Sequence, residues 1–334
     1  MRTLLLLVTL VAGIAAAFAI DVLRVLQQPL NLAESSLFEI RKGQAFSGVA
    51  QALADQGFLP GVPRSTYYLK AYARVMEIGP QIKSGEYRLT PDMNALQAIQ
   101  MFVDGRSVLH DLRLIEGWTF AQALAEVRKH PRVRQTMPDA TPEAVYAALG
   151  RSDPHPEGRL FPDTYHFSKG ITEIEFLQRA ANTMDKVLAA EWAARTEALP
   201  YQSMEEALVM ASIVEKETGA EHERTQIAGV FVRRLNLGMR LQTDPTVIYG
   251  LGTGFDGNLR LNDLRTDTPY NTYTRTGLPP SPICLPGRAA IHAALHPDSG
   301  SALFFVSRGD GTHVFSDTLE QHEAAVRRYQ LGKR

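Results

Sequence analysis

The sequence has a single cysteine and almost no net charge, and each shortage excludes a class of protein. Cys284 alone cannot form an intramolecular disulfide or a cysteine-rich metal site. A formal net charge of -1 offers no electrostatic attraction to polyanions, so nucleic-acid binding is disfavoured. Beyond the amino terminus, no stretch is long and apolar enough to span a bilayer. What is present, 45% hydrophobic and 21% charged residues, is typical of a folded protein.

The amino-terminal segment is the strongest global signal in the chain. It is uncharged from Leu4 to Ile20, which approaches the length that a membrane-spanning helix needs. Arg2 would stay cytoplasmic under the positive-inside rule, which places the rest of the chain outside. A cleaved signal peptide is the alternative, with small residues at Ala15, Ala17 and Ala19. We favour the first alternative, an uncleaved anchor that comprises residues 1–26, because apolar residues resume at Val22.

A strand, a polar turn and an amphipathic helix are predicted in succession in three segments of the amino-terminal half. The segments are residues 37–53, 86–101 and 112–128. Near the expected helix starts, three polar side chains could cap the helices: Ser47, Asn94 and Thr119. Strands that alternate with helices indicate small α/β modules. A connection rich in proline, aspartate and histidine follows at about residues 132–158.

A nearly all-apolar helix over residues 207–214 leads into two carboxylates, Glu215 and Glu217, and Gly219 then suits a left-handed helix cap. At about 100° per residue the two side chains point about 200° apart, so both cannot face one cleft. The preceding neighbours on the face of Glu217 are apolar, whereas those of Glu215 are smaller and partly polar. Apolar surroundings and the negative helix end both raise the pKa of Glu217, as a general acid requires. Periodicity alone leaves open the alternative that both are ordinary solvated or ion-paired carboxylates.

A segment from Arg265 to Gly287 combines polar aromatic residues with five prolines and two glycines. Such a segment cannot be a regular helix or strand, and its polar aromatics suit a hydroxyl-rich ligand. Further on, His292 and His296 are four residues apart on an expected helix, a spacing that could ligate a metal. Because no third ligand accompanies them in the sequence, we expect no metal site.

Several long motifs together resemble one known family. They are EGRLFPDTY at 157–165, ASIVEKETG at 211–219, AGVFVRRLNLGMRLQTDPTVIYG at 228–250, YNTYTRTGLPPSPI at 270–283 and HVFSDTLEQH at 313–322. From about residue 37 to its end, the chain resembles the YceG-like family of membrane-anchored endolytic murein transglycosylases. It departs from the pattern at Ser281 and at Cys284-Leu285, where relatives often carry a glycine and an Ala-Asn pair. The departure puts in doubt any substrate contact at those positions.

The resemblance implies an α+β fold in three parts. These are a transmembrane helix at residues 1–26, a small LysM-like α/β subdomain at 37–105 and a larger mixed α/β catalytic domain at 106–334. The protein would cross the inner membrane once, with a cytoplasmic amino terminus and the bulk of the chain periplasmic or otherwise extracytoplasmic. Peptidoglycan synthases would be natural partners of an enzyme in that place.

The resemblance also implies a substrate, a reaction and a site. Glycan strands of peptidoglycan would be cut between N-acetylmuramic acid and N-acetylglucosamine to leave 1,6-anhydro ends, with no metal or organic cofactor. Glu217 would be the single acid and base, because Glu217-Thr218 mirrors the Glu-Ser pair of lytic transglycosylases. The residues expected to bind substrate are Glu223, Gln242, Asp244, Tyr270, Asn271 and Tyr273. Asp244 could instead cap a helix, and Asn271 could instead clamp a loop.

Three other functions are weighed against this one. A muramidase-type hydrolase would use the same Glu217 but admit water to the reaction. A membrane-anchored scaffold would bind glycan through residues 37–105 without cutting it. A metal-dependent peptidase is disfavoured, because the sequence shows no complete set of metal ligands.

Overall fold

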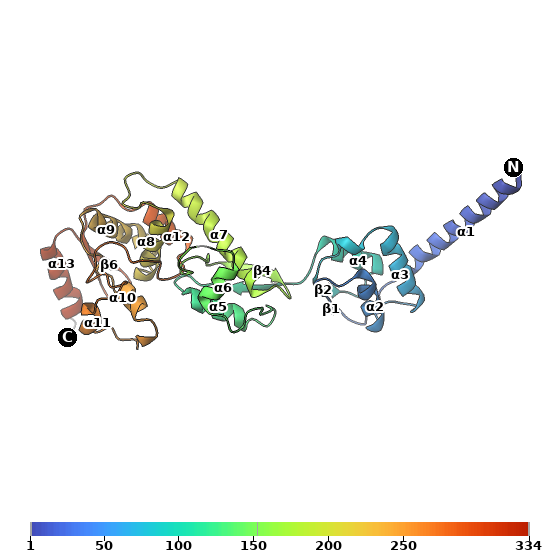
Figure 1. The fold of residues 1–334 in the computed structure, drawn as a ribbon, viewed down its shortest axis with the longest axis horizontal. Helices are drawn as coiled ribbons and strands as arrows, with labels where there is room; N and C mark the ends of the chain where they lie inside the picture. The colour runs from blue at the N-terminus through green and yellow to red at the C-terminus, as the bar shows by residue number, and fades with distance from the viewer. Residues whose placement is uncertain (1, 152, 333–334) are drawn as a thin grey trace. The chain divides into compact units, whose positions relative to one another are not determined.

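The computed structural model describes residues 2–151 and 153–332 and is a mixed α/β protein (Figure 1). The chain divides into two compact units. The first contains the chain up to Asp111 together with His166–Ile171, and the second contains Leu112–Tyr165 and the chain from Thr172 onward. Two short strands, β3 (Leu109–Arg113) and β4 (Thr164–Ser168), pair with each other where the units are divided. A division into subdomains at residues 105 and 106 stays a prediction.

The first helix, α1 (Arg2–Leu26), is apolar and exposed over most of its length. Its stretch Leu4–Leu26 has a mean hydropathy of 2.4 and, within the described residues, is the one helix long and apolar enough to cross a membrane. Near its end Val22 and Leu26, 8% and 1% exposed, are buried in the core of the first unit. By length and composition the helix is consistent with the expected membrane anchor and also with the alternative, a signal sequence.

In the first unit, three helices share a hydrophobic core with a two-stranded sheet. β1 (Ser36–Ile40) pairs antiparallel with β2 (Gly85–Leu89), with Ser36 opposite Leu89. The helices are α2 (Phe46–Asp55), α3 (Arg64–Val75) and α4 (Ala95–Asp104), and a single turn of 3-10 helix, η1 (Gly79–Gln81), precedes β2. Aromatic rings fill the core: Phe38 stacks on Phe102 at 5.8 Å, and Phe102 meets Tyr87 edge-on at 4.8 Å.

The residues that cap the helices can be compared with the three caps predicted from the strand-turn-helix pattern. Asn94 caps α4, and Thr119 caps α5 (Phe120–Lys129), each in a reciprocal pair with the glutamine three residues on. Both predictions are confirmed. The prediction for Ser47 is wrong, because α2 already begins at Phe46 and Ala45, which has no side-chain acceptor, occupies the cap position.

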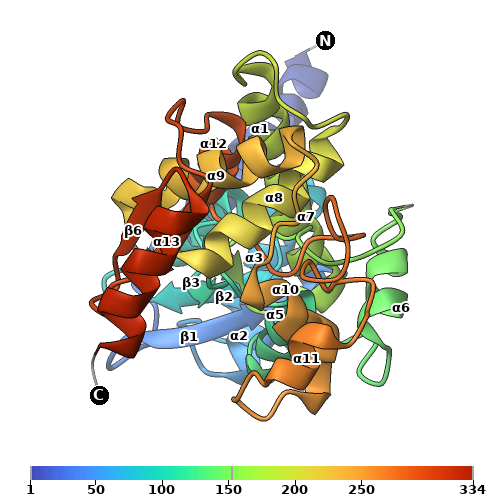
Figure 2. The ribbon, with the colours of Figure 1, turned by 90° about the vertical axis from the view of Figure 1, so that its left-hand side faces the viewer.

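The second unit is mainly helical and contains an antiparallel hairpin, β5 (Phe304–Ser307) with β6 (His313–Ser316). Its remaining helices are α6 (Pro142–Ala148), α7 (Glu173–Ala193), α8 (Met204–Glu217), α9 (Arg224–Asn236), α10 (Asp244–Leu251), α11 (Leu261–Arg265), α12 (Arg288–Leu295) and α13 (Leu319–Val326). Single turns are η2 (Glu221–Glu223) and η3 (Gly252–Gly254), and a π-helical turn, η4 (Arg327–Leu331), follows α13. Figure 2 views the unit from the side that carries α10, α11, α13 and β6.

The helix that the sequence singled out, α8, is the centre of this unit. Its residues from Ala207 to Val214 are all buried, and α7, α9, α10 and α12 pack around it. A nearly all-apolar stretch is stable here because no face of the helix meets water over these residues. The predicted left-handed cap at Gly219 is wrong: Thr218 leaves the helix in an extended conformation, and its hydroxyl accepts a hydrogen bond from the Ala220 N–H at 2.9 Å. That bond makes the turn without a residue at positive φ.

Candidate active site

A cleft of about 540 Å³ lies at the carboxyl end of α8, within the second unit. Segments that are far apart in the sequence form it: the ends of α8 and α9, the loop before α10 and the start of that helix, the loop between α11 and α12, the hairpin β5–β6, α13 and η4. The lining residues are Glu217, Arg234, Leu241, Gln242, Asp244, Tyr273, Phe304, Phe305, Val306, Ser307, His313, Leu319, His322, Val326 and Gln330. Its polar and aromatic lining suits a ligand with many hydroxyl and amide groups.

Glu217 is the last residue of α8, and its half-buried carboxyl group faces this cleft. The Thr243 hydroxyl donates a hydrogen bond to its Oε1. Burial raises the pKa of Glu217 to about 7; the bond from Thr243 and the charge of Arg234 oppose this rise, while the charge of Asp244 adds to it. A carboxyl that is partly protonated near neutral pH can donate a proton and then accept one.

Glu215, the rival carboxylate, lies in different surroundings. It is not among the residues that line the cleft, and its Oε2 accepts a hydrogen bond from the Gly287 N–H, just before α12, at 2.9 Å. Burial raises the pKa of Glu215 as well, with Glu116 contributing and the bond from Gly287 opposing. The two side chains therefore face apart, as the helix period predicts.

Gln242, Asp244 and Tyr273 line the cleft together with Glu217. Gln242 has a φ of 52°, a left-handed conformation that is strained for a residue with a side chain. The Tyr273 hydroxyl donates to the Asp244 Oδ1 at 2.6 Å, and burial is the first cause that raises the pKa of Tyr273. Asp244 opens α10 but shows no capping bond, so the carboxylate is held by a tyrosine on the wall of the cleft.

Tyr270 and Asn271 lie outside the residues that line the cleft. The Tyr270 hydroxyl pairs with that of Ser281 at 2.7 Å. Asn271 is fully buried, and its amide nitrogen donates to the carbonyl oxygens of Asp263, Leu264 and Thr266 at 2.7–3.2 Å. Its side-chain oxygen accepts from the Tyr273 N–H at 2.8 Å. The geometry is that of the loop clamp, and glycan contact by either residue stays a prediction.

Glu223 is also absent from the lining and is buried, 4% exposed. Its carboxylate accepts from the backbone N–H and the Nδ1 of His313, at 2.9 and 2.8 Å. Burial raises the pKa of Glu223, the two bonds from His313 lower it, and the pKa is lowered overall. Glu223 therefore holds a residue that lines the cleft. Direct contact between Glu223 and glycan stays a prediction.

Two residues of the site, Thr243 and Arg234, received no role from the sequence. Thr243 is 1% exposed, and its N–H donates to the Thr272 hydroxyl at 3.0 Å, which holds it beside Glu217. The Arg234 guanidinium donates to the carbonyl oxygens of Leu303, Arg240 and Leu241. It thereby ties the residue before β5 to the loop that precedes α10. Both residues fall inside the motif at 228–250, the only signal that could have found them.

Another carboxyl with a raised pKa, that of Glu157, lies away from the cleft. Burial raises the pKa of Glu157 to about 7, against hydrogen bonds from the N–H groups of Phe120 and Gly158 and from the Tyr249 hydroxyl. A pKa near 7 is therefore not unique to Glu217. Its place in the cleft distinguishes Glu217 from Glu157.

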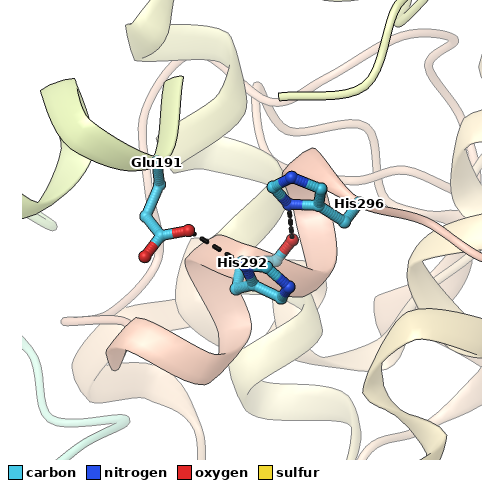
Figure 3. Close-up of side chains that lie close together, drawn as sticks. All are labelled: Glu191, His292 and His296. Atoms are coloured by element: carbon cyan, nitrogen blue, oxygen red, sulfur yellow. Dashed lines mark hydrogen bonds and ion pairs between the residues drawn. The ribbon is translucent and has the colours of Figure 1, made fainter. Parts of the chain in front are cut away.

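The structure brings a third side chain, Glu191 of α7, to His292 and His296 (Figure 3). The Glu191 carboxylate lies 2.9 Å from the His292 Nδ1 and also accepts from Arg288. Both nitrogens of His296 face carbonyl oxygens, those of His292 at 3.1 Å and Ala194 at 2.8 Å. The two imidazole rings stack at 4.1 Å and 18°, and the hydrogen bonds above engage Nδ1 of His292 and both nitrogens of His296. In this arrangement the cluster fastens α7 to α12.

The chain matches the model of the YceG-like family over residues 38–328, and it belongs to that family. It is similar to an endolytic murein transglycosylase of Bacillus subtilis, with 30% identity over 88% of this chain and 84% of the relative. A second protein of that name, from Streptococcus pneumoniae, is 30% identical over 62% of this chain and 37% of its own length. The crystal structure of a YceG-like protein from Listeria monocytogenes superposes with a TM-score of 0.54 at 30% identity, covering 87% of this chain and 99% of that one.

Proposed function

We propose that this protein is an endolytic murein transglycosylase that cuts peptidoglycan glycan strands, with Glu217 as the single general acid and base. The observation that carries the proposal is the carboxyl of Glu217, whose pKa burial raises to about 7, on the wall of a cleft of about 540 Å³. Membership of the YceG-like family and relatives named endolytic murein transglycosylase support the substrate and the reaction. The endolytic mode of cutting is supported by those names alone.

The reaction begins with protonated Glu217. It donates its proton to the oxygen between N-acetylmuramic acid and N-acetylglucosamine, and the bond from C1 of the muramic residue to that oxygen breaks. N-acetylglucosamine leaves with the new hydroxyl, while the muramic 2-acetamido group helps to stabilise the positive charge at C1. Since Thr243 donates to Oε1, the proton is carried on Oε2.

The second half of the reaction restores the acid. The Glu217 carboxylate takes the proton of the muramic 6-hydroxyl as that oxygen closes on C1 to form the 1,6-anhydro end. An attacking group that belongs to the same sugar has a high effective molarity, so no water needs to be activated. No step requires a metal or organic cofactor.

A muramidase-type hydrolase is the second candidate, because Asp244 places another carboxylate on the same cleft. It would activate water in the way that paired carboxyls do in ordinary glycosidases. Mass spectrometry of the cut strands separates the two functions, since a hydrolase leaves reducing ends that are heavier by one water per cut. Chelators are expected to leave cleavage unchanged, which would dispose of a metal-dependent peptidase.

The rest of the chain is proposed to bring this site to its substrate. α1 anchors the protein in the inner membrane with its amino terminus in the cytoplasm, and the units after it are extracytoplasmic. Residues 37–105 form a LysM-like glycan-binding subdomain, and residues 106–334 form the catalytic domain. A site held near the membrane would meet strands as they emerge from peptidoglycan synthases.

The decisive experiment compares Glu217→Gln with Glu215→Gln on purified uncrosslinked glycan. The two residues lie on the same helix, but Glu217 alone lines the cleft, so Glu215→Gln is the matched control. We expect Glu217→Gln to abolish 1,6-anhydro products and Glu215→Gln to retain them. Full cleavage by a folded Glu217→Gln variant would refute the assignment, and glycan binding without cleavage by the wild type would favour the scaffold.

A further inference from the structure

His313 has a place in the cleft that the reaction above does not use. It is the first residue of β6, lines the same cleft as Glu217, and has a side chain that is 11% exposed. Its ring meets that of Phe305, another lining residue, edge-on at 5.4 Å and 88°. The imidazole is therefore fixed by packing on one side while it borders the cleft on another.

Glu223 determines which ring nitrogen carries the hydrogen. Its carboxylate, with a side chain 5% exposed, accepts from the His313 N–H at 2.9 Å and from Nδ1 at 2.8 Å. An ionised carboxylate can only accept, so Nδ1 must be protonated. His222 also lies near Glu223, with its Nε2 3.8 Å from Oε1 on a side chain that is 74% exposed.

In the neutral form of the ring, the remaining nitrogen, Nε2, is then an acceptor. In the neutral imidazole the hydrogen bond at one nitrogen fixes the tautomer, and Nε2 keeps its lone pair. Within the part of the chain that the structure describes, Nε2 of His313 forms no hydrogen bond. A buried pair that leaves one acceptor at the edge of a cleft is suited to a ligand that offers a hydroxyl or amide N–H.

We propose that His313 binds the glycan by accepting a hydrogen bond at Nε2 from a sugar hydroxyl or acetamide N–H, and that Glu223 is the positioning residue that fixes the required tautomer. The proposal rests on the proposed function in taking glycan as the ligand of this cleft. Its rival is a purely structural role, in which the pair only ties β6 to η2.

Three substitutions separate these roles. His313→Asn keeps a donor at the place of Nδ1 for Glu223 but removes Nε2 from the cleft. His313→Gln can instead put an amide oxygen near the place of Nε2. The glutamine of Glu223→Gln has one carbonyl oxygen, and the backbone N–H of His313 donates to it. The amide nitrogen of that glutamine then donates to Nδ1 of His313, so the ring hydrogen moves to Nε2.

The first test reads the tautomer without any activity. Full-length protein labelled with ¹⁵N-histidine is measured by NMR, with His313→Asn used to assign the signal. We expect Nδ1–H in the wild type and Nε2–H in Glu223→Gln. His322, which lines the same cleft and stacks on Phe304 at 5.2 Å, should be unchanged and serves as the internal control. An unaltered His313 signal in Glu223→Gln would overturn the positioning role.

The second test measures glycan binding in the Glu217→Gln background, where the strands are not cut. Loss of one hydrogen bond is expected to weaken binding of uncrosslinked glycan about tenfold in His313→Asn and in Glu223→Gln. His313→Gln should bind more tightly than His313→Asn, whereas equal weakening of both would indicate the structural role. Unchanged binding in His313→Asn would overturn the proposal while leaving Glu217 in place. If the Glu217→Gln variant without a further substitution still cleaved glycan, the proposed function would be overturned instead. The tautomer result would still stand in that case.

Discussion

Removing the hydrogen bond from Thr243 to Glu217 directly tests the pKa of the proposed acid. Thr243→Val keeps the shape of the side chain and removes the hydroxyl that donates to Oε1. This bond stabilises the ionised form and lowers the pKa of Glu217, so its removal must raise that pKa further. Because Thr243 is 1% exposed, water cannot readily take the place of the hydroxyl.

The size of the change follows from the strength of such bonds. A hydrogen bond to a charged group contributes about 1.5–3 kcal/mol, and one pKa unit corresponds to about 1.4 kcal/mol. The pKa of Glu217, about 7 in the wild type, should therefore rise by about 1–2 units in Thr243→Val. Since the free enzyme must carry a protonated acid, the alkaline limb of kcat/KM should move up by the same amount.

The assay is the rate of 1,6-anhydro product release from uncrosslinked glycan between pH 5 and 10. A ¹³C NMR titration of the Glu217 carboxyl gives the pKa without turnover. Thr246→Val is the control for disturbance of the hydrogen bonds around Thr243, because the Thr246 hydroxyl lies 2.8 Å from the Thr243 carbonyl oxygen and 2.9 Å from the Thr272 hydroxyl and does not reach Glu217. The reasoning would be refuted by an alkaline limb that stays in place or moves down in Thr243→Val.

Two further substitutions test the walls of the cleft. Tyr273→Phe removes the 2.6 Å hydrogen bond to Asp244 and leaves that carboxylate unrestrained beside Glu217. We therefore expect kcat/KM to fall about tenfold in steady-state assays while the thermal transition is retained. An unchanged kcat/KM would show that this pair does not contribute to the reaction. Arg234→Lys loses the planar guanidinium that reaches three carbonyl oxygens. The free energy of unfolding in urea should then fall by about 2 kcal/mol. A decrease below about 0.5 kcal/mol would show that a point charge suffices there.

Local features of the fold were predictable from the sequence because they depend on neighbours in the chain. The caps at Asn94 and Thr119 follow from residue type and spacing, and the divergence of Glu215 from Glu217 follows from the helix period. Ser47 failed as a cap because the exact first residue of a helix is set by packing as well as by capping.

The partners within the site were not predictable, because they come from distant segments. Thr243 reaches Glu217 from a loop 26 residues further on, and His313 meets Glu223 from 90 residues further on. Glu191 joins His292 across 101 residues, which is why that pair of histidines had no visible third partner in the sequence. No periodic pattern encodes such pairs, although Thr243 and His313 fall in the long motifs at 228–250 and 313–322.

A last prediction separates the cost of burying a carboxyl from its use in catalysis. Burial raises the pKa of both Glu217 and Glu157 from 4.5 to about 7. Between these values the folded protein keeps a proton that the unfolded chain has lost, so stability falls as the pH rises through this window. Above pH 7 each ionised group lowers the free energy of unfolding by at most about 3 kcal/mol relative to a neutral group of the same shape.

Glutamine is that neutral group, and both Glu217→Gln and Glu157→Gln should therefore stabilise the protein at pH 8 and have little effect at pH 4. The difference between variant and wild type in urea unfolding should grow through pH 4.5–7 for both. Only Glu217→Gln should lose cleavage, because Glu157 lies away from the cleft. If Glu217→Gln lost activity without gaining stability at pH 8, its carboxyl would not be the desolvated acid that the mechanism requires, and catalysis would have to draw its proton from elsewhere.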